Sequence, residues 1–192
     1  LLCTLGAASA KELCYFTGAS SATLRALEKK GILSMEQQEV LHRVSLEEVE
    51  PAPPPVLNGE QEDAFQGLDQ LARSGKPAAA LLYGVTGSGK TQVYIRLIWS
   101  ALERGRTALV LVPEIVLTPQ LLRSFAAQFG KQVAVLHSSL RAGERYDEWK
   151  RARRGEAQVV IGTRSAVFAP LENLGLIILD EEEESSYKSE NA

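Results

Sequence analysis

A glycine-rich segment that ends in lysine and threonine has the residue types needed to hold the phosphates of a nucleotide. Residues 84–91 read Gly-Val-Thr-Gly-Ser-Gly-Lys-Thr and match the phosphate-loop pattern G-x-x-x-x-G-K-[ST]. The glycines let backbone N–H groups face phosphate oxygens, while Lys90 brings a positive charge and Thr91 a hydroxyl for Mg²⁺. The residues assigned to nucleotide binding in this loop are Gly84, Gly87, Ser88, Gly89, Lys90 and Thr91.

A second segment, far downstream, ends a buried run on two carboxylates. The apolar residues 176–179 are followed directly by Asp180 and Glu181. An aspartate at the end of a buried strand can hold Mg²⁺, and the next glutamate can orient the water that attacks the γ-phosphate. We therefore assign Lys90, Asp180 and Glu181 to catalysis, and Thr91 with Asp180 to Mg²⁺.

The sequence around the phosphate loop argues against the simpler interpretation, a glycine-rich surface turn. The loop follows an apolar run at 78–83 and precedes a helical pattern that ends near Gly105. Strand, loop and helix in that order are the setting that this motif requires. The segment is therefore predicted to bind a nucleotide.

Apolar runs and helical patterns alternate through most of the chain. Strands are expected at 79–83, 107–112, 132–136, 157–161 and 175–179. Helices are expected at 90–104, 119–129 and 143–154, each followed by a glycine. Strands that are continuously apolar are typical of a parallel sheet covered on both faces. The pattern predicts a doubly wound α/β fold with ligands at the carboxyl ends of the strands.

Composition limits the classes of protein to which the chain can belong. With 192 residues and 45% hydrophobic content it is long enough to bury a core, and no apolar run approaches the ~20 residues that span a bilayer. Two cysteines, Cys3 and Cys14, are too few for a disulfide scaffold and suggest reduced thiols in the cytosol. The net charge of −3 indicates that any nucleic-acid site must be a local patch.

A proline-rich stretch marks the expected domain boundary. Residues 51–55, Pro-Ala-Pro-Pro-Pro, favour an extended, semi-rigid spacer between domains at 1–50 and 56–192. In the smaller part we expect a short helix at 10–16, a turn, a second helix at 21–30 and strand-like residues at 38–44. That order is typical of a winged-helix domain. Acidic side chains outnumber basic ones in this part, so a docking module is favoured over strong autonomous DNA binding.

Two loops that follow strands have groups suited to a nucleic-acid backbone. Pro119 and Gln120 open a helix after the strand at 107–112, and Thr163 and Arg164 follow the strand at 157–161. The helix between these loops has a basic cluster that is interrupted by acidic residues. Its members are Arg145, Lys150, Arg151, Arg153 and Arg154, with Glu144, Asp147 and Glu148 among them. Either a DNA-contacting cluster or a solvated helix face with internal ion pairs fits this pattern.

Several segments together resemble one known family. They are Gly84–Thr91, Leu111–Gln120, Leu136–Ser138, Gly143–Arg145, Trp149–Gly155, Val160–Pro170 and Leu174–Lys188. The chain is similar in these stretches to the N-terminal ATPase lobe of the replication-restart helicases of superfamily 2, the PriA or primosomal protein N′ family. Residues 17–31 are similar to the winged-helix domain that precedes that lobe, and Gln61 resembles the glutamine that contacts adenine in this superfamily.

The resemblance implies a RecA-like P-loop NTPase lobe and a bacterial 3′→5′ DNA helicase that uses ATP and Mg²⁺. Its partners would be branched forks, single-stranded DNA, the primosome and single-strand-binding proteins, and its location would be the cytoplasm at the nucleoid. Single-stranded DNA would lie near Pro119, Gln120, Thr163 and Arg164. The second lobe with its arginine finger and the family's zinc-binding cysteines are expected outside this sequence. An arginine finger contributes roughly 10³–10⁵ in rate, so this stretch alone would hydrolyse ATP very slowly.

One departure and two alternatives remain open. The family's histidine after Asp-Glu-Glu is Glu183 here, either a solvent-facing variant or a change in how nucleotide state is coupled to DNA. A P-loop translocase or restriction-enzyme motor subunit without unwinding activity would share the phosphate motifs. A regulatory fragment, in which nucleotide controls docking of a partner, would bind ATP without a DNA-dependent step.

Overall fold

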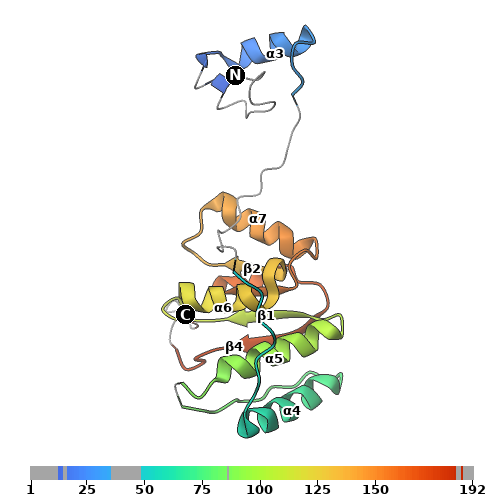
Figure 1. The fold of residues 1–192 in the computed structure, drawn as a ribbon, viewed down its shortest axis with the longest axis vertical. Helices are drawn as coiled ribbons and strands as arrows, with labels where there is room; N and C mark the ends of the chain where they lie inside the picture. Colours follow the sequence, from blue (N-terminus) through green and yellow to red (C-terminus); the bar gives the residue numbers. More distant parts are fainter. Residues whose placement is uncertain (1–12, 15–16, 36–48, 86, 185–186, 188–192) are drawn as a thin grey trace, which may run out of the picture. The chain divides into compact units, whose positions relative to one another are not determined.

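The computed structural model describes residues 13–14, 17–35, 49–85, 87–184 and 187 (Figure 1). The chain divides into two compact units, residues 1–40 and residues 41–192. Within the described residues, no helix combines the length and the apolar character that crossing a membrane requires.

The described part of the N-terminal unit is built around helix α3, Ser21–Lys29. The Ser20 hydroxyl accepts a hydrogen bond from the Thr23 N–H and caps the helix, and Leu24 is buried. The chain leaves the helix through Gly31, which has a φ of 70°. The helix expected at 21–30 is therefore confirmed. Residues 13, 14 and 17 are also helical. The rest of the helix expected at 10–16 and the strand-like residues at 38–44 lie outside the described residues.

The larger unit contains a four-stranded sheet in which every pair of neighbouring strands is parallel. The strands are β1 (Thr107–Leu111), β2 (Val133–Leu136), β3 (Val159–Gly162) and β4 (Leu174–Leu179), in the order β2-β3-β1-β4. The helices are α4 (Gly59–Arg73), α5 (Lys90–Glu103), α6 (Pro119–Phe129) and α7 (Ala142–Arg153), with short 3₁₀ turns η1 (Gly130–Gln132) and η2 (Arg164–Phe168). Four of the five expected strands and all three expected helices of this unit are confirmed within two residues.

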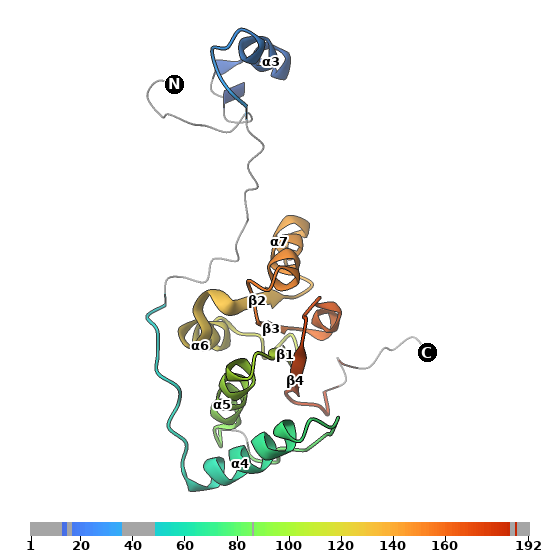
Figure 2. The ribbon, with the colours of Figure 1, turned by 90° about the vertical axis from the view of Figure 1, so that its right-hand side faces the viewer.

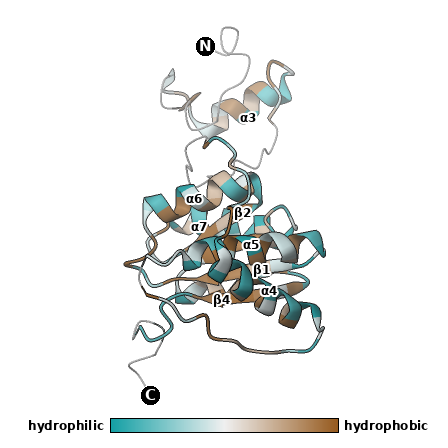
Figure 3. Cartoon of the chain, turned by 60° about the horizontal axis from the view of Figure 1, so that its bottom comes forward, coloured by the Kyte–Doolittle hydropathy of each residue, from teal (hydrophilic) through white to brown (hydrophobic). Residues whose placement is uncertain are grey.

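Helices cover both faces of the sheet, as the continuously apolar strands predicted (Figure 2). One core joins α5 and α6 to the sheet through side chains such as Ile98, Phe125 and Ile161. The other core joins the opposite face to α7 and η2 through Ala152, Val160 and Ala166. Figure 3 shows the same layering, with hydrophobic strands between helices whose outer faces are hydrophilic. The doubly wound arrangement is confirmed.

Helix α4 was not predicted from the sequence, although its start contains a recognisable signal. The Asn58 side chain accepts a hydrogen bond from the Gln61 N–H, and the Gln61 side chain accepts one from the Asn58 N–H. This reciprocal capping box satisfies two backbone donors at the helix start. The helix runs alongside α5, and the capping box fixes the position of Gln61 at its first turn.

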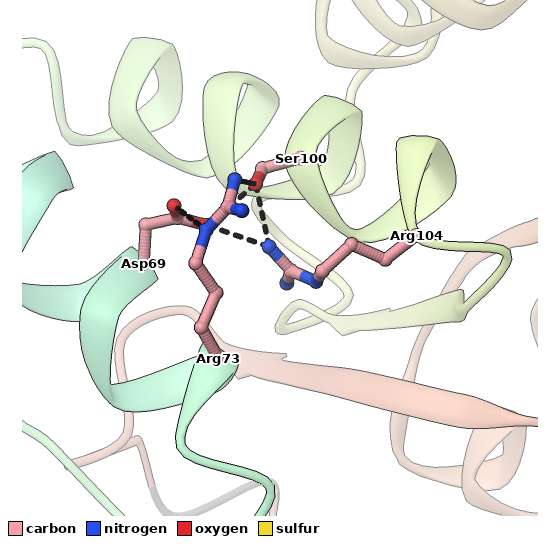
Figure 4. Close-up of polar contacts among 4 residues, drawn as sticks. All are labelled: Asp69, Arg73, Ser100 and Arg104. Carbon is pink, nitrogen blue, oxygen red and sulfur yellow. Dashed lines mark hydrogen bonds and ion pairs between the residues drawn. The ribbon is translucent and has the colours of Figure 1, made fainter.

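A polar cluster joins α4 to α5 (Figure 4). Asp69 accepts hydrogen bonds from Ser100 at 2.5 Å, from Arg73 at 2.5 Å and from Arg104 at 2.8 Å. Burial of the carboxyl raises its pKa, but these hydrogen bonds and the positive charge of Arg73 outweigh burial and lower the pKa of Asp69 to about 2. The cluster therefore holds the two helices together through an ionised aspartate.

The proline-rich segment lies along the lobe instead of standing away from it. The Ala52 N–H donates to the Ala127 carbonyl at 2.9 Å, and the Gln128 side chain donates to the Pro53 carbonyl at 2.9 Å. Arg96 of α5 donates to the Pro55 carbonyl at 3.2 Å and also lies over the Phe65 ring of α4. Proline's fixed φ keeps the segment extended, and each of these contacts uses a carbonyl or an N–H that extended backbone exposes.

The prediction of a strand at 79–83 is wrong, because residues 75–85 form neither helix nor strand. Tyr83 is 91% exposed and Ile177 of β4 is 52% exposed. None of the described elements pairs with the outer edge of β4, and a cleft of about 920 Å³ lies between that edge and residues 76–84. An apolar run becomes a strand only when a neighbour accepts its hydrogen bonds, and this run has none there.

The basic cluster of α7 is divided between the interior and the surface. Arg151 forms an ion pair with Glu148 at 2.8 Å, and Glu148 is only 2% exposed. The Glu148 carboxylate also accepts the N–H of Val135, at the edge of β2. Lys150 forms an ion pair with Asp147 at 2.9 Å. Arg151 therefore holds α7 against β2 and is not a surface cation, so neither interpretation of the cluster holds for all its members.

Candidate nucleotide-binding site

The phosphate loop turns sharply through two glycines before α5 begins at Lys90. Gly87 has a φ of 81° and Gly89 a φ of 83°, a left-handed conformation that favours glycine. A Cβ on Gly89 would lie 2.3 Å from the Gln61 amide nitrogen, so a larger residue would be strained by its φ and would also displace the Gln61 side chain from the loop. Residue 86 lies outside the described residues. The loop brings its backbone and the start of α5 together, where N–H groups and the helix dipole favour an anion.

Lys90 lies at the first position of α5 and folds back onto the loop. Its ammonium group donates a hydrogen bond to the Gly84 carbonyl at 2.8 Å. Thr91 follows it in the first turn and is half-buried. Since Lys90 reaches the start of the loop from its end, its charge lies inside the curve where phosphates would bind.

Gln61 reaches the phosphate loop from a different element. Its side-chain amide donates to the Ser88 carbonyl at 2.9 Å, while its side-chain oxygen caps α4 through Asn58. Both groups of the amide are thereby oriented. The sequence predicted Gln61 as a contact to the adenine base, and the structure brings it to the loop that would hold the phosphates.

Asp180 follows β4 and is held through its main chain and its carboxylate. Its N–H donates to the Leu111 carbonyl of β1 at 2.9 Å. The Tyr94 hydroxyl of α5 donates to Asp180 Oδ1 at 3.2 Å, and the Tyr187 hydroxyl donates to the Asp180 carbonyl at 2.8 Å. Glu181 follows with a φ of 50°, which is uncommon for a residue with a side chain. The hydrogen bond from Tyr94 therefore joins the helix that follows the phosphate loop to the Asp-Glu segment after β4.

The electrostatics of the two tyrosines reflect their acidic surroundings. Burial, the negative charge of Asp180 and the hydrogen bond to it raise the pKa of Tyr94 well above its usual value. Burial and the charges of Asp180 and Glu181 raise the pKa of Tyr187 to about 12. Both hydroxyls therefore keep their protons and remain hydrogen-bond donors.

The donor set fits Mg²⁺ bound together with a nucleotide. Mg²⁺ in such sites is held by one or two protein oxygens and by phosphate oxygens, and it keeps several waters. Thr91 and Asp180 supply such oxygens, and the neighbouring Tyr94 lies on the same helix as Thr91. Among the residues that the structure describes, no three metal-ligating side chains form a cluster that would hold an ion without a nucleotide.

The residues predicted to approach DNA lie in loops at the carboxyl ends of neighbouring strands, β1 and β3. Pro119 and Gln120 are exposed at the start of α6, which Thr118 caps. Arg164 is exposed at the start of η2, but Thr163 is only 5% exposed. Thr163 instead joins strands, because its N–H donates to the Leu136 carbonyl. Three of the four side chains are therefore accessible from one edge of the sheet.

Two features of the site were missed from the sequence. Tyr94 has the spacing of an apolar-face residue in the expected helix at 90–104, and its 8% exposure agrees with that, but its hydroxyl reaches Asp180. The strand-end loops also expose large apolar side chains, namely Ile115, Val167 and Phe168. The sequence contained a signal for the second feature only, since these residues fall outside the periodic runs that mark the core.

A parallel sheet with a phosphate loop and an Asp-Glu pair at its carboxyl edge defines a P-loop ATPase lobe of the helicase type. The family model described as DEAD/DEAH box helicase matches residues 60–192, and the chain belongs to this family. The sequence-based assignments to superfamily 2 and to a RecA-like lobe are confirmed. The winged-helix assignment stays a prediction.

Within this broad family, the chain is most informatively compared with the replication-restart proteins. The chain is 49% identical over 185 residues to the replication restart protein PriA of Bacillus subtilis, covering 94% of this chain and 23% of the relative. It is 47% identical over 169 residues to PriA of Synechocystis, covering 88% of this chain and 20% of the relative. The resemblance to the PriA family is thus confirmed, and the chain spans about a quarter or less of the length of these relatives.

A solved structure supports the fold independently. The structure of RecG bound to a three-way DNA junction matches with a TM-score of 0.59 and 33% identity. The match covers 68% of this chain and 18% of the RecG chain. The helicase family uses nucleotide and Mg²⁺ in general, which agrees with the type of site described above.

Proposed function

We propose that this stretch is the first ATPase lobe of an ATP-dependent 3′→5′ DNA helicase that restarts stalled replication. The observation that supports it most directly is the meeting of Gln61, the phosphate loop and Asp180 within one lobe. A purely structural loop would not need a base-reading amide, a lysine and a carboxylate at one edge of a sheet. The relatives in the PriA family, which are named for replication restart, agree with this function.

In the proposed site each residue has a separate role. Gln61 contacts the adenine, and the N–H groups of residues 87–91 face the phosphates. Lys90 leaves the Gly84 carbonyl for the β- and γ-phosphates. Thr91 and Asp180 would hold Mg²⁺, which neutralises phosphate charge when bound, and Glu181 orients the attacking water. Positioning and charge, rather than covalent chemistry, supply the acceleration.

DNA is proposed to cross the carboxyl edge of the sheet at the loops after β1 and β3. Pro119, Gln120 and Arg164 offer exposed groups there, and Thr163 fixes the geometry of the second loop. RecG, with a similar lobe, has been solved on a three-way DNA junction, which supports a branched-DNA substrate here. We expect the protein to act at the nucleoid in the bacterial cytoplasm, with the primosome and single-strand-binding proteins as partners.

The nucleotide assignment is tested by calorimetric titration of ATP and ADP with Mg²⁺. Lys90→Ala removes the flexible cation aimed at the phosphates and should lower affinity at least tenfold, or about 1.4 kcal/mol. Lys131→Ala, an exposed lysine in the η1 turn, is the matched control and should bind as the parent does. Equal binding by the parent and Lys90→Ala would contradict the site.

The helicase assignment is tested in the full-length protein by DNA-stimulated ATPase and strand-displacement assays. A helicase should show both activities, with a 3′→5′ polarity on partial duplexes. A translocase would show DNA-stimulated ATPase without strand displacement, and a regulatory docking protein would show neither. Either of these results would replace the proposed function while leaving the nucleotide site in place.

A further inference from the structure

Asp180 is held at three of its atoms by three separate parts of the lobe. Its N–H is bonded to β1, its carboxylate Oδ1 to Tyr94 of α5, and its carbonyl to Tyr187 beyond the acidic turn. None of the described residues hydrogen-bonds the other carboxylate oxygen, Oδ2. The main chain and one oxygen of the carboxylate are therefore fixed, while the second oxygen stays available.

We propose that Tyr94 and Tyr187 are positioning residues that act as a two-hydroxyl clamp on Asp180 and aim its carboxylate at Mg²⁺. The inference rests on the proposed function, in which Asp180 holds that ion. Mg²⁺ demands near-ideal octahedral geometry, so a carboxylate that is already oriented binds it more readily than a mobile one. Tyr94 supplies the orientation directly, and Tyr187 supplies it through the main chain.

The chemistry of a tyrosine suits this role better than that of a basic residue. A lysine or arginine beside Asp180 would add a positive charge that competes with the cation for the carboxylate. A phenol donates a hydrogen bond while it leaves the full negative charge on the aspartate.

The backbone directly after Asp180 indicates what the clamp restrains. Glu181 has a φ of 50°, and such residues persist only when their surroundings determine the conformation. The Tyr187 bond fixes the carbonyl just before Glu181, and the Glu184 N–H donates to the carbonyl of Glu181 itself at 2.9 Å. The clamp thus also fixes the direction of the glutamate that we propose to orient water.

The location of Tyr94 links the clamp to the nucleotide. It lies three residues after Thr91 on α5, so the two side chains share a face of that helix. Helix α5 therefore positions both proposed Mg²⁺ ligands. Thr91 belongs to this helix, and the Asp180 carboxylate accepts a hydrogen bond from its Tyr94. A change at the phosphate loop that moves α5 would move the Asp180 carboxylate with it.

The test measures how binding of a fluorescent, non-hydrolysable ATP analogue to the full 192-residue chain depends on Mg²⁺. Tyr94→Phe and Tyr187→Phe keep the ring and remove only the hydroxyl. In each variant, the affinity for the analogue without Mg²⁺ should stay within twofold of the parent. The Mg²⁺ concentration that gives half of the Mg²⁺-dependent gain in affinity (the Mg²⁺ midpoint) should rise at least threefold. Tyr146→Phe on α7, where the side chain is 59% exposed, is the matched control and should leave both quantities unchanged.

The possible results distinguish a failure of the clamp proposal from a failure of the proposed nucleotide site. If the parent binds the analogue with Mg²⁺ dependence but neither variant shifts the Mg²⁺ midpoint, the clamp is contradicted and the nucleotide site stands. A lower melting temperature and a lower metal-free affinity with an unmoved midpoint would mean that the hydroxyls are only structural, which also contradicts it. A parent that shows no Mg²⁺-dependent binding would overturn the proposed function and the clamp together.

Discussion

The side-chain amide of Gln61 donates a hydrogen bond to the main-chain carbonyl of Ser88 at 2.9 Å, across 27 residues of sequence. The amide oxygen is simultaneously used to cap α4. One glutamine therefore ties the start of α4 to the apex of the phosphate loop. If the loop moves when phosphates bind, this hydrogen bond should shift the Gln61 side chain, which we propose to contact the base.

Gln61→Glu should weaken ATP binding about five- to fiftyfold, or about 1–2.3 kcal/mol. Glutamate keeps the oxygen that caps α4 but loses the amide donor and places a carboxylate against the Ser88 carbonyl. The preference for ATP over GTP should fall as well, because the adenine contact is lost. Calorimetric titration with both nucleotides checks this. Gln66→Glu on the same helix should change neither affinity, and a Gln61→Glu variant indistinguishable from it would contradict the role.

Asp69→Asn should lower the free energy of unfolding by about 1–2 kcal/mol at pH 7. One pKa unit corresponds to about 1.4 kcal/mol, and the exposure of the Arg73 side chain reduces the value that the pKa shift alone would give. Urea unfolding of both proteins measures the difference. Asp63→Asn, an exposed aspartate of the same helix, should have little effect.

The contribution of Asp69 should also depend on pH in a defined direction. Its pKa is lower in the folded protein than in the unfolded chain, so the stabilisation is fully present above about pH 5. It should be lost as the pH falls from about 4 to about 2, and the gap between wild type and Asp69→Asn should close over that range. A gap that stays constant down to pH 3 would contradict an ionised Asp69 as its source.

DNA binding by this stretch alone should be weak and sensitive to salt. If two or three phosphates are contacted near Arg164, the log–log salt slope for single strands should be about −1.4 to −2.1, from ~0.7 per phosphate. Arg164→Ala should reduce both the affinity and the slope, whereas Arg25→Ala in α3 should not if the N-terminal unit is a docking module. Fluorescence anisotropy with a labelled oligonucleotide at several salt concentrations measures both. A slope near zero would contradict the assigned surface.

Glu183→His in the full-length protein should change DNA-stimulated ATPase far more than nucleotide affinity. Glu183 is exposed and lines the cleft beside Asp180, so it adds negative charge next to the proposed Mg²⁺ ligand without packing against it. Glu182→His, at the exposed neighbouring position, is the control for charge alone. If both quantities stay within twofold of the parent, the position has no coupling role.

Local signals in the sequence were sufficient for most of the fold. The start of α6 was predictable because Thr118 and Pro119 are, respectively, a capping residue and a favoured first residue of a helix. The strands β1, β2 and β3 were predictable because they are buried between two helical layers and are therefore apolar throughout. β4 was predictable from its apolar composition alone, although most of its residues are exposed or half-buried. Residues 79–83 have the same composition, yet their conformation depends on a neighbour that no local pattern specifies.

The contacts of the site depend on side chains that serve two purposes. Tyr94 belongs to an apolar helix face, so periodicity accounts for it fully and conceals the hydroxyl that reaches Asp180. Arg151 looked like a surface cation until its partner Glu148 proved to be buried with it. Thr163 lies in a loop at the end of a strand but is itself buried. Hydrogen bonds between distant elements decide these roles, and a single sequence does not display them.

The outer edge of β4, which is not paired by any described strand, affects how the protein must be made. A nascent chain that has been translated only as far as β4 presents a row of unpaired N–H and C=O groups beside the exposed side chains of Leu81, Tyr83 and Ile177. Another such chain on the same polysome can pair with that edge, because partly synthesised domains expose the surfaces that later pack. Chaperone binding during translation should therefore concentrate on this part of the lobe.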